Sequence, residues 1–79
     1  MTKTGLLIKR FRIEDCYPQK AVAEIIGVPL ATYRSWEYGK CLPNYENIEK
    51  LLEHYSENED LEILYQSWVE ERGGKIENI

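Results

Sequence analysis

The chain has 79 residues and a formal net charge of −4, and its 43% hydrophobic content is enough for one small globular domain but not for several. No apolar run approaches the roughly 18 residues of a membrane span, and the N-terminus lacks the apolar stretch of a signal peptide. We therefore expect a cytoplasmic protein without a membrane partner.

The first predicted element is an amphipathic helix over about residues 4–14. Leu7, Ile8 and Phe11 fall on one face of it. The dipeptide Tyr17-Pro18 should break this helix, because the residue before a proline is pushed out of helical dihedral angles. Pro18 then suits the first turn of the next helix, where its missing N–H costs nothing.

Residues 19–38 predict two short helices that meet at Gly27, the first over about 19–26 and the second over about 29–38. Ala23 is small enough for the two helices to cross closely, and Gly27 can adopt a positive φ without steric cost. Such a unit presents its second helix to the major groove of DNA while the first lies across the backbone. The expected core side chains of this helix-turn-helix are Val22, Ala23, Ile26, Tyr33 and Trp36.

Two more helices are expected after the helix-turn-helix. Asn44 is a candidate N-cap for the first of them, whose apolar stripe ends at Tyr55. The acidic segment 56–60 links it to a last helix over about residues 58–72. Residues 1–72 therefore form the predicted domain, and residues 73–79 form a short tail. The apolar stripe of the last helix consists of Leu61, Leu64, Tyr65, Trp68 and Val69.

Several further residues accompany the helix-turn-helix at a characteristic spacing. An arginine, Arg12, stands seven residues before the opening Gln19, and Glu37 precedes the run Gly39-Lys40-Cys41-Leu42-Pro43. Over about residues 6–55 this pattern resembles the Cro and repressor family of DNA-binding regulators. The resemblance implies an all-α, five-helix, lambda-repressor-like fold, double-stranded DNA as the partner, and no cofactor.

The face of the second motif helix opposite Tyr33 and Trp36 is the candidate DNA-reading surface. Arg34 is its only cation and suits guanine or a phosphate, although it could also lie on the surface without a partner. Leu30 could pack against a thymine methyl group, or against a neighbouring helix of the same protein. The resemblance implies base contacts at Leu30, Ala31 and Ser35. It also implies a phosphate contact at Gln19, a position that sometimes supports a base-reading residue. The complete set of expected DNA-binding residues is Gln19, Leu30, Ala31, Thr32, Arg34, Ser35, Tyr38 and Lys40.

The resemblance also implies a buried salt bridge between Arg12 and Glu37, which would join the first helix to the end of the third. A guanidinium can bind a carboxylate through two parallel hydrogen bonds, which suits a shielded site. The role of this pair is therefore expected to be structural.

The negative net charge is concentrated in the second half of the chain. Residues 1–45 carry a net charge of +3, and residues 46–79 carry −7. Since charges are screened over about 8 Å at physiological salt, the acidic half should have little effect on DNA that faces the basic half.

The sequence does not predict an enzyme. Cys16 and Cys41 have no CxxC spacing, and His54 is the only histidine, so neither a zinc site nor a catalytic triad can be assembled. We expect a sequence-specific DNA-binding transcriptional regulator, a dimeric repressor of a phage or mobile element that covers a promoter at a palindromic operator. Leu61, Leu64, Tyr65 and Trp68 are either core residues or dimer contacts.

Two alternatives remain at this stage. The spacing of Tyr33, Trp36, Gly39 and Pro43 also resembles the winged-helix excisionases, which bend DNA, but those lack a preceding helix with Arg12. The acidic C-terminal half could instead bind a protein partner, as in an antitoxin.

Overall fold

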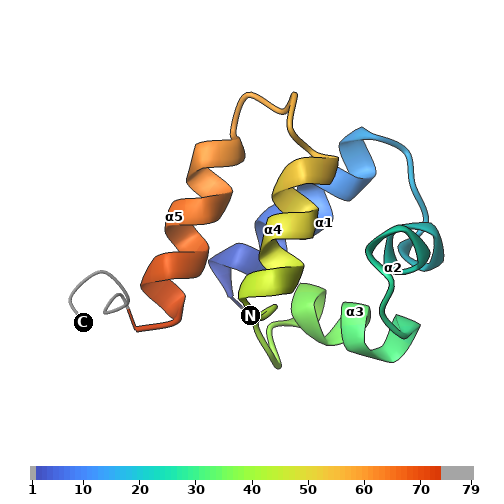
Figure 1. The fold of residues 1–79 in the computed structure, drawn as a ribbon, viewed down its shortest axis with the longest axis horizontal. Coiled ribbons are helices and arrows are strands. Elements are labelled where there is room, and N and C mark those ends of the chain that lie inside the picture. The colour runs from blue at the N-terminus through green and yellow to red at the C-terminus, as the bar shows by residue number, and fades with distance from the viewer. Residues whose placement is uncertain (1, 74–79) are drawn as a thin grey trace.

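The computed structural model describes residues 2–73, and within that range the chain forms five helices and no strand (Figure 1). None of these helices is long and apolar enough to cross a membrane. Most of the helix ends predicted from the sequence lie within two residues of the helix ends in the structure. The helices are α1 (Lys3–Glu14), α2 (Gln19–Ile26), α3 (Leu30–Tyr38), α4 (Tyr45–His54) and α5 (Leu61–Glu71).

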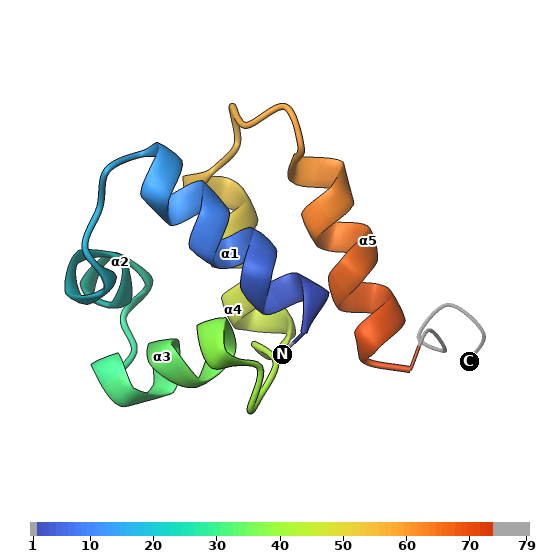
Figure 2. The same cartoon turned by 180° about the vertical axis from the view of Figure 1, so that it is seen from behind.

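Helix α1 lies at the centre of the molecule. It passes between α5 on one side and the α2–α3 pair on the other, with α4 crossing one of its faces (Figures 1 and 2). The apolar stripes of all five helices meet in one core, in which the ring of Phe11 meets the ring of Tyr55 edge to face at 5.4 Å. The core therefore needs every helix, including the last.

Local capping explains where the helices begin and end. The side chain of Thr2 accepts a hydrogen bond from the amide of Gly5 at 2.9 Å, and Asn44 caps α4 in the same way. Helix α1 ends at Glu14, as predicted, and Cys16 adopts a left-handed φ of 62° before the chain reaches Tyr17-Pro18.

Helix α3 begins at Leu30, and Pro29 is its N-cap without a side-chain hydrogen bond. The predicted start of the last helix needs correction. Helix α5 begins at Leu61 rather than near residue 58, because the side-chain oxygen of Asn58 accepts from the amide of Asp60 at 2.8 Å and holds this stretch in a turn.

Helix α5 is fixed to the rest of the domain through its C-terminal half. The indole N–H of Trp68 donates to the carbonyl oxygen of Pro43 at 2.7 Å, and the Glu71 carboxylate accepts from the backbone amides of Lys3 and Thr4 at 2.7 and 2.9 Å. Leu64 and Trp68 are buried in this core. Of the two alternatives left open for these two residues, core or dimer contact, their burial favours the core. Of the predicted tail, residues 74–79 lie outside the described part of the chain.

Candidate nucleic-acid interface

The turn between α2 and α3 has the geometry that the sequence predicts. Gly27 ends α2 with a φ of 90°, and its amide donates to the carbonyl oxygen of Ala23 at 2.8 Å. The amide of Val28 donates to the same oxygen at 3.0 Å. A residue with a Cβ would be strained at this φ, so glycine is what allows so tight a turn.

Two aromatic side chains orient α3. Tyr33 and Trp36 are buried, and their rings meet edge to face with centroids 5.7 Å apart. Because both lie on one face, the opposite face of α3 is turned outward. In both views α3 forms an outer edge of the molecule, at the end opposite the α4–α5 loop (Figures 1 and 2).

The salt bridge expected between Arg12 and Glu37 is present and bidentate. Arg12 Nε donates to Glu37 Oε2 at 2.6 Å, and Nη2 donates to Oε1 at 3.2 Å. The Glu37 side chain is 1% exposed and that of Arg12 is 13% exposed, so water hardly reaches the pair. A third guanidinium nitrogen, Nη1, donates to the carbonyl oxygen of Tyr17 at 2.9 Å. The pair thus fixes the end of α3 to α1 and to the loop that leads into α2.

Glu37 is a buried carboxylate whose charge is fully compensated. Burial alone would raise its pKa, but hydrogen bonds from Arg12, Tyr33 and Gln19 outweigh that effect and hold the pKa below its usual range. The Tyr33 hydroxyl donates to Oε2, and burial followed by this hydrogen bond raises the pKa of Tyr33. At neutral pH Glu37 is therefore ionised and Tyr33 is neutral.

Gln19 connects this buried network to the outer face of α3. Its amide Nε2 donates to Glu37 Oε1 at 3.0 Å, which leaves its carbonyl Oε1 to accept from Arg34 Nε at 3.1 Å. The carboxylate of Glu37 requires the NH₂ group of Gln19 to face it, so the orientation of the amide is determined. Within residues 2–73, the terminal nitrogens of Arg34 make no hydrogen bond and are available to a ligand.

The remaining candidate residues differ in how accessible they are. Ala31, Thr32, Tyr38 and Lys40 are exposed. Leu30 is only partly exposed and packs against the core. The hydroxyl of Ser35 donates to the carbonyl oxygen of Thr32 at 2.6 Å, so it can accept from a base more readily than it can donate to a phosphate.

Sequence reasoning did not identify Arg34 as the residue that Gln19 contacts. The two residues are 15 positions apart on different helices, and periodicity says nothing about contacts between helices. The sequence signal was indirect: a glutamine opens α2, and a single arginine lies on the outer face of α3.

Comparison with family models assigns the central part of the chain to a known family. A family model described as "Helix-turn-helix" matches residues 8–61, more than half of the chain, and this range includes α2 and α3 entirely. No curated protein and no solved structure matches the chain significantly.

Proposed function

Because this chain belongs to the Cro/repressor-type helix-turn-helix family of DNA-binding regulators, we propose that it is a sequence-specific transcriptional repressor that binds a palindromic operator as a two-fold dimer. Helix α3 enters the major groove, and the start of α2 meets the phosphate backbone.

The Gln19–Arg34 hydrogen bond is the observation that best supports this proposal. It holds an exposed arginine in a defined orientation, with its two terminal nitrogens available for guanine O6 and N7. Holding a long, flexible side chain in advance lowers the entropy lost when it contacts a base. Ala31 lies one turn earlier on the helix and is small enough to admit a thymine methyl group nearby.

A second copy of the chain is the proposed partner in operator binding. One short recognition helix reads few base pairs, and two half-sites about 34 Å apart increase the discrimination against other sequences. The candidate dimer surface lies between α4 and α5, where a hollow of about 570 Å³ is lined partly by Tyr45, Leu52, Leu61 and Tyr65. Tyr45 and Tyr65 are 57% and 36% exposed, so this surface offers apolar area that a second copy would bury.

Promoter occlusion is the proposed mode of repression. A dimer that covers two successive major grooves excludes another protein from the same face of the DNA, and this needs no cofactor. The resemblance to phage and mobile-element repressors supports this mode.

Selection of bound duplexes from a random pool, followed by titration of the enriched site, tests the proposal. We expect an enriched palindrome, two chains per duplex, and binding at least a thousandfold tighter than to random duplex at physiological salt, on the order of other specific regulators. A pool without an enriched motif would refute sequence-specific binding. An enriched motif without two-fold symmetry would refute only the dimer.

A further inference from the structure

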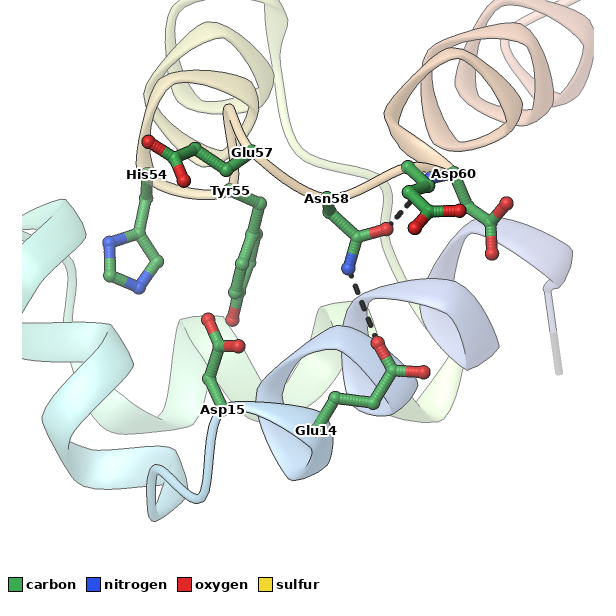
Figure 3. Close-up of a pocket in the computed structure, with 8 residues that line it drawn as sticks. Glu14, Asp15, His54, Tyr55, Glu57, Asn58 and Asp60 are labelled. Carbon is green, nitrogen blue, oxygen red and sulfur yellow. Dashed lines mark hydrogen bonds between the residues drawn. The ribbon is translucent and has the colours of Figure 1, made fainter.

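A hollow lined mainly by acidic side chains lies where the end of α1 meets the α4–α5 loop (Figure 3). Its volume is about 490 Å³, and no lysine or arginine is among the residues that line it. Five carboxylates line the hollow: Glu14, Asp15, Glu57, Glu59 and Asp60.

Part of this negative charge is already compensated. Arg10, which lies beside the hollow, forms ion pairs with Glu14 and with Asp60. Among residues 2–73, no cation is within ion-pair distance of the other three carboxylates. A net negative charge therefore remains at the hollow.

A buried hydroxyl group without a partner also belongs to this site. Tyr55 lines the hollow and is only 2% exposed, yet its hydroxyl makes no hydrogen bond within the described residues. In Figure 3 the hydroxyl end of the Tyr55 ring points toward Asp15. The Nε2 atom of His54, the preceding residue, likewise has no partner in that part of the chain. Buried polar groups normally have a partner, because leaving one unpaired costs free energy. The two atoms therefore keep unused hydrogen-bonding capacity.

The donor and acceptor pattern indicates what kind of ligand fits. The carboxylates only accept hydrogen bonds, and the oxygen of the Tyr55 hydroxyl can accept as well. No group of three His, Cys, Asp or Glu residues within residues 2–73 is arranged to hold a metal ion. A guanidinium has five N–H donors and no acceptor, and it pairs with carboxylates and stacks on aromatic rings. We propose that this hollow binds an arginine side chain of a protein partner.

The position of the hollow indicates that the molecule which binds there is a protein rather than DNA. The α4–α5 loop lies at the end of the molecule opposite α3 in both views (Figures 1 and 2). Phosphates would be repelled from this surface, whereas a basic protein segment would be attracted to it. The partner would therefore bind to a surface that stays open while α3 is in the groove.

Titration of the ¹⁵N-labelled full chain with the peptide acetyl-Gly-Arg-Gly-amide, followed by amide chemical shifts, tests this inference. The reference ligand is the same peptide with citrulline, which keeps the shape of arginine and loses its charge. We expect saturable shifts of the amides of residues 14–15 and 54–60, with a dissociation constant on the order of millimolar, and no saturable shift with citrulline. Equal responses to the two peptides would overturn the inference.

Three variants test whether the residues that line the hollow bind the arginine peptide. Tyr55→Phe removes only the unpaired hydroxyl and should weaken binding of the arginine peptide about tenfold. Asp15→Asn should weaken it about threefold. Glu70→Gln, which makes the same charge change as Asp15→Asn at an exposed position of α5, should leave binding unchanged. If all three variants bind the peptide as the wild type does, or if the control loses as much as Asp15→Asn, the attraction is diffuse and the site does not exist.

Discussion

Arg12 and Glu37 meet through two parallel hydrogen bonds, 2.6 and 3.2 Å long, although 25 residues separate them in the chain. The carboxylate that Arg12 holds also accepts from Gln19, and Gln19 in turn holds Arg34 on the outer face of α3. A structural ion pair and a candidate base-reading residue thus belong to one network. Effects on stability and on recognition should therefore be coupled in this protein.

The Arg12→Ala substitution should destabilise the fold by about 3–5 kcal/mol, because it leaves the buried Glu37 carboxylate without its main partner. A double-mutant cycle of thermal melts with Glu37→Ala should show strong coupling, with the double mutant less destabilised than the two single effects added together. Arg10→Ala is the control: its ion pairs are exposed, so it should cost about 1 kcal/mol or less. A melting temperature of Arg12→Ala within a degree of the control would contradict the buried role.

Stability should depend on pH through Glu37. Since the pKa of Glu37 is lowered in the folded state, its contribution to the free energy of unfolding is complete above the unfolded pKa of about 4.5. It is then lost as pH falls through the lower folded pKa. Denaturant unfolding should therefore show Glu37→Gln well below wild type at pH 7, with the difference shrinking below about pH 4. A difference that stays constant from pH 7 to pH 3 would mean that the carboxylate charge contributes nothing.

Replacement of Arg34 by alanine should reduce sequence preference more than general affinity. The expected loss is about 1–3 kcal/mol on the selected operator if Arg34 reads guanine, and much less on random duplex. Fluorescence anisotropy titrations of both duplexes make the comparison. Equal losses on the two duplexes would make Arg34 a phosphate contact.

Replacement of Lys40 by alanine should reduce general DNA affinity rather than sequence preference. Lys40 is exposed and follows Gly39, which ends α3 with a φ of 82° and turns the chain away from the helix. A phosphate contact at this position predicts weaker binding to every duplex and a salt slope reduced by about one per protomer. Titrations at several salt concentrations measure that slope, and an unchanged slope would exclude the contact.

Gln19→Ala should weaken operator binding largely through Arg34. If Gln19 acts by orienting that arginine, removing Arg34 in the Gln19→Ala background should cost clearly less than removing it from the wild type. Operator affinities of the two single mutants and the double mutant complete the cycle. Additive losses would show that Gln19 acts on DNA independently, through its own phosphate contact.

Tyr65→Glu should prevent dimerisation without unfolding the protomer, because Tyr65 is exposed and the substitution places a charge on the α4–α5 surface. Ile13→Glu is a matched control at an exposed apolar position of α1. Sedimentation with the operator duplex should give two chains per duplex for wild type and for the control. It should give one chain, or none, for Tyr65→Glu; two chains for this variant would place the dimer surface elsewhere.

Most of the fold could be predicted because it depends on short-range patterns. Helix α2 was predicted to the residue, since an apolar stripe is followed by a glycine that can adopt a positive φ. An error arose where a local side-chain contact competed with the helical pattern. At the start of α5 the side chain of Asn58 holds a turn where the sequence predicted the first helical residues.

By itself the sequence determined which face of each helix is apolar, because a period of 3.6 residues is a property of the chain. It did not determine what covers each face, since the same stripe can be buried by a neighbouring helix or by a second molecule. Only the tertiary structure placed Trp68 and Leu64 in the core and left Tyr65 exposed. It alone also brought Gln19 against Arg34 and left the Tyr55 hydroxyl buried beside five carboxylates. These contacts join residues far apart in sequence, and they follow from how the helices pack rather than from the local preferences of any segment.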